Sequence, residues 1–157
     1  MSNVFLPLSL DQLWAALEAS PEAVLYSGGT DLLVRLRNGM AAPDHMICLE
    51  RIDALQGVVD HGNEIFIGAC TTHSRLLTDP LILEHFPVLK KALKELGSPP
   101  IRNMGTIGGN IVTASPAGDT LPPLYILGAD LELRTRDDSR RISLGDFVKG
   151  PSMTDIR

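Results

Sequence analysis

Two glycine-rich segments carry the residue types in this sequence that are suited to binding chemistry. The first glycine segment, residues 27–32, reads Ser-Gly-Gly-Thr-Asp-Leu, and the second, residues 105–119, combines glycines with hydroxyl, amide and carboxylate side chains. A concave run of backbone N–H groups can bind a pyrophosphate, and glycine permits both the close approach and the unusual φ values. A helix that follows such a loop adds its N-terminal dipole. Two such loops in one small chain predict an extended ligand with separate polar parts.

Other kinds of site are disfavoured by what the sequence lacks. There is no GxGxxG motif and no glycine followed by lysine, which disfavours a Rossmann site and excludes a P-loop. The first segment taken alone also fits a plain tight connection between a strand and a helix. No Ser/His/Asp set or paired carboxylates appear, so no catalytic residue is assigned. We expect the histidines to be surface or capping residues and not metal ligands: His45, His61, His73 and His85.

The composition of the chain argues against several classes of binding partner. The net charge of -5 and the pI of about 5.3 argue against nucleic acid, which needs a dense basic surface. No apolar run is long enough to cross a bilayer, and no targeting pattern is visible at the start. Cys48 and Cys70 are too few to hold an iron–sulfur cluster and are expected to be reduced and buried. The expected location is cytoplasmic, with no membrane partner.

The elements that must position the first segment form a small α/β unit. Ser9 and Gln12 have capping-box spacing and predict a helix. Residues 23–26 predict a strand that runs into the first segment, followed by a helix with Leu32, Leu33 and Leu36 on its buried face. Gly39 suits the position after that helix. With a further strand at residues 46–49, this order predicts parallel strands.

The rest of the chain predicts a second lobe. The turn-rich stretch 57–63 suggests a boundary, which gives lobes at residues 1–62 and 63–157. We expect a strand at 64–69, helices after Thr72 and over 87–96, and a strand at 130–136 paired with 141–143. Gly150 and Pro151 suggest the turn of a hairpin that the chain leaves unfinished. Tyr26 and Tyr125 are expected in the core.

The two segments together resemble a known family. Residues 27–32, 101–110 and 114–119 are similar, in order and spacing, to the FAD-binding subunit of molybdenum hydroxylases, which includes the medium subunits of xanthine dehydrogenase and carbon monoxide dehydrogenase. The resemblance covers nearly the whole chain. It implies an α+β fold, the two-lobed FAD-binding domain of the vanillyl-alcohol oxidase (PCMH) type. That domain has a small parallel α/β lobe and a larger mixed or antiparallel lobe.

The resemblance also implies roles for individual residues. The first segment would hold the pyrophosphate. Ser115 and Asp119 would hydrogen-bond the ribityl chain and the flavin end. The residues that would line the phosphates and ribityl chain are Thr106, Gly108, Gly109 and Asn110. Arg102 is expected to organise the second segment through a salt bridge, and Asp31 to cap a helix or face away. The implied cofactor-binding residues are Tyr26, Ser27, Gly28, Gly29, Thr30, Asp31, Leu32, Gly68, Ala69, Leu96, Gly97, Gly105, Thr106, Gly108, Gly109, Asn110, Ser115, Gly118 and Asp119.

The implied function is electron relay. FAD would be the cofactor of this chain, with molybdopterin and [2Fe–2S] centres on partner subunits, namely a molybdopterin-binding subunit and an iron–sulfur subunit. Electrons would leave through FAD to NAD+ or another acceptor. Because family members continue with a further domain beyond Arg157, we expect a fragment that is not active alone. Two alternatives are a stand-alone flavin oxidase or reductase of the same fold, and a flavin-free assembly module.

Overall fold

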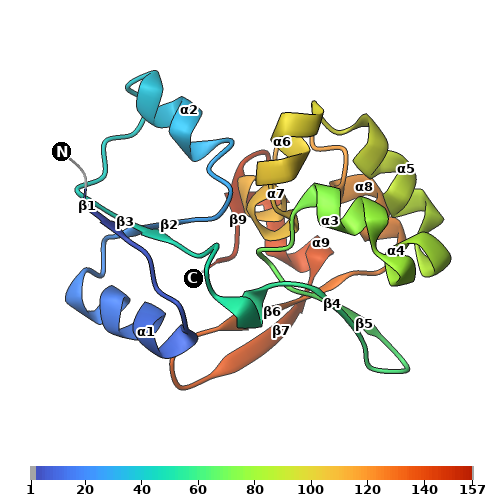
Figure 1. Ribbon diagram of the computed structural model, residues 1–157, viewed down its shortest axis with the longest axis horizontal. Coiled ribbons are helices and arrows are strands. Elements are labelled where there is room, and N and C mark those ends of the chain that lie inside the picture. Colours follow the sequence, from blue (N-terminus) through green and yellow to red (C-terminus); the bar gives the residue numbers. More distant parts are fainter. Residues whose placement is uncertain (1–2, 157) are drawn as a thin grey trace.

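A parallel three-stranded sheet forms the N-terminal part of the protein, as seen in a computed structural model that describes residues 3–156 (Figure 1). The strands lie in the order β1 (Asn3–Phe5), β3 (His45–Cys48), β2 (Val24–Tyr26). Parallel neighbours need crossover connections, which α1 (Leu10–Ala19) and α2 (Leu32–Arg37) supply. The predicted α/β unit is confirmed, and β1 is a strand that the sequence did not reveal.

The start of α1 follows from its capping residues. Ser9 Oγ accepts a hydrogen bond from the Gln12 backbone N–H at 3.2 Å, while Gln12 Oε1 accepts from the N–H of Leu8 at 2.8 Å. The helix buries Leu13, which forms a small core with Ile47 and Ile52. Each such buried side chain contributes roughly 1.5–3 kcal/mol relative to exposure. This core fixes α1 against the sheet.

The second helix differs from the prediction. None of its residues is buried, and Leu33 is 47% exposed. Asp31 takes the capping position without a capping hydrogen bond and instead lies 3.9 Å from Arg35 in an ion pair. Gly39 follows the helix with φ +68°, as predicted. The expected buried face is wrong at Leu33, because α2 stands away from the sheet (Figure 1).

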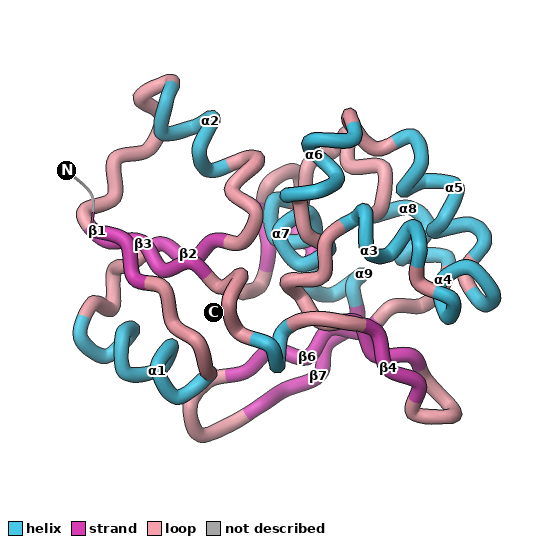
Figure 2. The backbone as a smooth tube through the Cα atoms, viewed as in Figure 1, coloured by secondary structure: helices cyan, strands magenta, loops and turns pink. Residues whose placement is uncertain are grey.

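A helical layer forms most of the second part (Figure 2). It follows the antiparallel hairpin of β4 (Val58–Asp60) and β5 (Ile65–Ile67). Its core contains Leu76, Leu93 and Phe147, each at most 1% exposed. The helices are α3 (His73–Thr78), α4 (Pro80–His85), α5 (Pro87–Glu95), α6 (Pro99–Met104), α7 (Ile107–Thr113), α8 (Leu121–Ile126) and α9 (Leu144–Phe147), with the short 3-10 turn η1 (Asp53–Leu55) ahead of β4.

Two hairpins complete the chain. The strands β6 (Asp130–Arg134) and β7 (Ser139–Ser143) pair antiparallel as predicted, and an Arg136–Glu18 ion pair joins their turn to α1. The strands β8 (Val148–Gly150) and β9 (Met153–Thr154) also pair, so the expectation of an unfinished hairpin is wrong. The suggested lobe boundary falls in the turn between β4 and β5 and stays a prediction.

The described helices are all short. The longest of them, α1, has 10 residues, and within residues 3–156 no helix has both the length and the apolar character needed to span a bilayer.

Candidate cofactor-binding site

The first glycine segment leaves the end of β2 and turns sharply. Gly28 and Gly29 both have left-handed backbone conformations, with φ +69° and +65°. A Cβ atom on Gly28 would lie 2.0 Å from the carbonyl oxygen of Met104, at the end of α6. Backbone therefore packs directly on backbone here, and only glycine fits. This contact brings the first and second glycine segments together.

The N–H groups of the first segment are divided between internal and free donors. The Gly28 N–H donates to Glu50 Oε1 at 2.7 Å, and the Gly29 N–H donates to the Ser27 carbonyl at 2.8 Å. The N–H groups of residues 30–32 have no acceptor within the described part of the chain. Successive unpaired N–H groups at such a turn form a concave anion site. The segment therefore has three successive N–H donors that the described part of the chain does not use.

The second glycine segment is helical over residues 107–113, and its prediction as a loop is wrong there. Thr106 precedes α7 and its Oγ1 accepts from the Gly109 N–H at 3.2 Å, a normal N-cap. The glycines serve packing, because a Cβ on Gly108 would lie 2.7 Å from the Cβ of Ala69. Gly109 faces the first segment, with the Ser27 carbonyl oxygen 3.6 Å from where its Cβ would lie.

The first-turn N–H groups of α7 are already used within the protein. Ile107 donates to the Thr71 carbonyl at 3.0 Å and Gly108 to the Ala69 carbonyl at 2.9 Å. They are therefore not free to bind a phosphate. The two glycine segments therefore contribute differently to the candidate site. The first offers unpaired backbone N–H donors, and the second offers closely packed backbone that forms one wall of the site.

The strand end after β5 supplies the third component. Gly68 passes so close to the connection after β3 that its Cβ would lie 2.4 Å from the Leu55 carbonyl oxygen. The same carbonyl accepts from the Cys70 N–H at 2.7 Å. Together with the Ala69–Gly108 contact, this places Gly68 and Ala69 between the connection after β3 and the second segment, which itself packs on the first segment at Gly28. Three regions distant in the sequence therefore converge.

The far end of the second segment is partly apolar. Asn110 Oδ1 accepts a hydrogen bond from the Thr120 hydroxyl, and Ser115 Oγ accepts from the Ala117 N–H at 3.3 Å. Asp119 is exposed. A cavity of about 300 Å³ adjoins this end and is lined by Ala114, Ser115, Pro116, Gly118, Leu121, Pro122, Tyr125, Val148, Gly150 and Pro151.

Tyrosine placement differs from the sequence prediction. Tyr125 lines this cavity and is 44% exposed, so its assignment to the core is wrong. Tyr26 is half-buried at the end of β2. Burial, followed by the contact with the Cys48 thiol, raises the pKa of Tyr26 to about 12. The phenol therefore keeps its proton at physiological pH.

Leu96 and Gly97 lie at the end of α5, and Arg102 binds their backbone. Its Nη1 lies 2.9 Å from the carbonyl oxygens of Leu96 and Gly97 and 3.2 Å from that of Lys94. The predicted salt bridge is wrong, because the guanidinium neutralises the negative end of a helix and not a carboxylate. Among the described residues, no hydrogen bond joins Leu96 or Gly97 to the first segment.

Replacing Arg102 tests this capping role. We expect Arg102→Met to lower the free energy of unfolding by about 2 kcal/mol, since several hydrogen bonds to one charged group are lost. Urea unfolding measures the change. Lys94→Met is the matched control, because its exposed ammonium makes no contact with these carbonyls. An equal loss in both variants would contradict the role given to Arg102.

The buried titratable groups near the site are neutral. His73 is only 2% exposed, and its Nδ1 has no partner, so the expectation of a surface or capping histidine is wrong for it. Burial lowers the pKa of His73 to about 4. Cys48 and Cys70 are free and buried as predicted, and burial raises the pKa of the Cys70 thiol. The Ser27 hydroxyl is buried beside Cys70 without a regular hydrogen bond.

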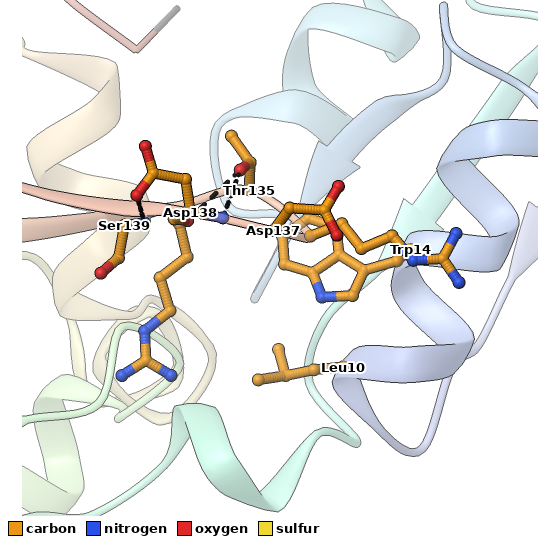
Figure 3. A pocket seen from close by; sticks show the side chains of 8 residues that line it. Leu10, Trp14, Thr135, Asp137, Asp138 and Ser139 are labelled. Atoms are coloured by element: carbon orange, nitrogen blue, oxygen red, sulfur yellow. Dashed lines mark hydrogen bonds between the residues drawn. The ribbon is translucent and has the colours of Figure 1, made fainter.

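A second cavity has a different chemistry. It has a volume of about 350 Å³ and lies between α1 and the β6–β7 turn (Figure 3), where Trp14 faces charged side chains. Its arginines are paired, Arg134 with Glu132 at 2.7 Å and Arg136 with Glu18. It shares no residue with the glycine segments. Within the described residues, no cluster of side chains could hold a metal ion.

Comparison with known proteins shows the family. Residues 1–157 match the FAD binding domain in molybdopterin dehydrogenase, and the chain belongs to this family. The nicotinate dehydrogenase FAD-subunit of Eubacterium barkeri is 37% identical over 83% of this chain and 44% of its own length. The glyceraldehyde dehydrogenase medium chain of Sulfolobus acidocaldarius is 33% identical over 94% of this chain and 52% of its own.

Solved structures share the fold. Carbon monoxide dehydrogenase from Hydrogenophaga pseudoflava superposes with a TM-score of 0.94 and 30% identity, over 99% of this chain and 55% of that one. Quinoline 2-oxidoreductase from Pseudomonas putida superposes with a TM-score of 0.95 and 28% identity, over 100% of this chain and 55% of that one. The predicted α+β fold of an FAD-binding domain is therefore confirmed. The chain spans about half the length of the relatives it matches.

Proposed function

We propose that this chain is the FAD-binding part of a molybdenum hydroxylase subunit and relays electrons. They would come from molybdenum and [2Fe–2S] centres on a molybdopterin-binding subunit and an iron–sulfur subunit, and would pass through FAD to NAD+ or another acceptor. The family match over the whole chain supports this proposal, as do relatives that are named FAD-subunits and medium chains of dehydrogenases. A cytoplasmic location is part of the same proposal.

The residues present fit FAD. The observation that carries the proposal is that three glycine-containing backbone segments pack together beside a turn with unpaired N–H groups, in which a Cβ on Gly28 would collide with the Met104 carbonyl. No cationic side chain lies within residues 27–32, so we assign the pyrophosphate to the N–H groups of Thr30, Asp31 and Leu32. The Asp31 carboxylate, half-exposed and near Arg35, stays on the outside of the turn.

The second segment would hold the flavin end. We assign Asn110, Ser115 and Asp119 to polar contacts with the ribityl chain and the ring, and the apolar cavity beside Ser115 to a neighbouring ring surface. Gly108 and Gly109 let this wall pack closely against Ala69 and the first segment. When bound, FAD supplies reversible electron transfer, so the chain itself needs to position it and does not need an acid or base.

Adding FAD to the purified protein tests the proposal. We expect the protein to acquire the visible absorbance of bound flavin, with saturation at one FAD per chain and a rise in thermal stability, because a ligand that binds only the folded state stabilises it. AMP is the control for non-specific nucleotide uptake. A protein that takes up no FAD contradicts the proposal and favours the assembly module. Reduction of the bound flavin by a small substrate without partner subunits would favour the stand-alone oxidase.

A further inference from the structure

Glu50 lies at the same edge of the sheet as the first glycine segment. It follows β3 by two residues, and Tyr26 at the end of β2 is in register with Cys48 at the end of β3. Since the carboxyl ends of parallel strands meet at one edge, Glu50 reaches the turn at Gly28 although 22 residues separate them. The two strands thus bring a carboxylate beside the proposed pyrophosphate site.

The contact between Glu50 and the turn is short and charge-assisted. Its Oε1 accepts from the Gly28 N–H at 2.7 Å. Such bonds are shorter and stronger than those between neutral groups. On its other side, Gly28 abuts the carbonyl of Met104. The Gly28 residue is therefore held from two directions, by a carboxylate on its N–H and by backbone packing on its Cα.

Glu50 has no cationic partner among the described residues. Its backbone forms part of the connection between β3 and β4, which is held by further hydrogen bonds. The Glu50 carbonyl accepts a hydrogen bond from Gln56 Nε2 at 2.8 Å. The carbonyl of Leu55, the residue before Gln56, accepts from the Cys70 N–H. This short connection therefore joins the first segment to the strand end that contacts Gly108. A residue placed here for charge pairing alone would contact an arginine or lysine, and Glu50 instead contacts backbone.

We propose that Glu50 is a positioning residue for the cofactor site, an inference that rests on the proposed FAD function. By engaging the Gly28 N–H from outside the turn, the carboxylate fixes the left-handed conformation of Gly28 and Gly29. The N–H groups of residues 30–32 then stay unpaired and convergent for the pyrophosphate. The acceptor oxygen performs this role. The negative charge strengthens the bond to the Gly28 N–H but also repels a neighbouring pyrophosphate, so its two effects on FAD binding oppose each other.

Two substitutions separate the acceptor from the charge. Glu50→Gln keeps a side-chain oxygen that can accept the Gly28 N–H, and we expect its FAD dissociation constant to stay within about threefold of wild type. Glu50→Ala removes the acceptor, and we expect FAD binding to weaken about tenfold, as loss of one hydrogen bond to a charged group predicts. Asp53→Ala is the matched control, because Asp53 is an exposed acid in the same connection.

A second measurement does not depend on FAD. In the FAD-free protein, hydrogen exchange of the Gly28 amide should accelerate about tenfold in Glu50→Ala, by the same reasoning, and stay near wild type in Glu50→Gln and Asp53→Ala. Unchanged or tighter FAD binding by Glu50→Ala would overturn the inference, as would Glu50→Gln as weak as Glu50→Ala. If wild type bound no FAD, the proposed function would fail, and amide exchange would still decide whether Glu50 orders the turn.

Discussion

Replacing Gly28 with alanine is expected to abolish tight FAD binding and to destabilise the protein. The new Cβ would lie 2.0 Å from the Met104 carbonyl oxygen, so either the first segment or α6 must move. The residue would also have to keep φ +69°, which costs roughly 1–2 kcal/mol for an L-residue. We expect FAD affinity to fall by at least about tenfold, or ~1.4 kcal/mol. Flavin fluorescence titration and thermal unfolding measure the two effects.

Gly39 provides a closely matched control for this experiment. Its φ of +68° is nearly the same as that of Gly28, but nothing lies within 4 Å of where its Cβ would be. Gly39→Ala should therefore show the conformational cost alone, about 1 kcal/mol, with FAD affinity unchanged. If the two variants lost the same amount of stability and both kept FAD, the close packing at Gly28 would not matter for the site.

Acidification should destabilise the protein through His73. Its pKa is about 4 in the folded state and 6.5 in the unfolded chain, so the folded state disfavours the protonated ring. The stability that depends on the neutral ring is fully present above pH 6.5, and it is lost as the pH falls from 6.5 to 4. Because one pKa unit corresponds to about 1.4 kcal/mol, this loss is about 3 kcal/mol. Denaturant unfolding at several pH values across this window measures it.

Replacing His73 separates its contribution to the pH dependence of stability from that of the other titratable groups. In His73→Leu the free energy of unfolding should fall less steeply between pH 6.5 and 4, because the buried group that gains a proton on unfolding is absent. His85→Gln removes an exposed histidine and should keep the wild-type slope. An identical slope in His73→Leu and wild type would show that His73 does not carry this pH dependence. Since His73 packs under Gly105, the same acidification should loosen the second segment.

Capping residues and the helical or strand periodicity of apolar residues make much of the fold predictable. The parallel unit, α1 with its Ser9 cap, α5 and the β6–β7 pair all have local sequence signals. The helices α6 and α8 were missed, because their prolines normally break a helix. Here Pro99 and Pro122 lie in the first turn, where the missing N–H costs nothing.

The site itself was only partly predictable. The glycine segments are visible in the sequence, but residues 107–113 form a helix whose Gly108 packs against Ala69, a contact that no local pattern records. The Glu50–Gly28 hydrogen bond joins residues 22 positions apart and has no sequence motif. His73 was missed for the same reason, since its burial is set by Gly105 and the surrounding helices and not by its neighbours in sequence.

The contact between Gly28 and Met104 has a consequence for the order of events during synthesis. The two residues are far apart in the sequence, so the ribosome releases the first glycine segment long before the backbone that it packs against. Until α6 has been made, the turn lacks its packing against the Met104 carbonyl, and only the Glu50 side of Gly28 can be in place. If the first segment holds FAD as proposed, we expect tight cofactor capture only after this long-range contact has closed, as a late step in the maturation of the protein.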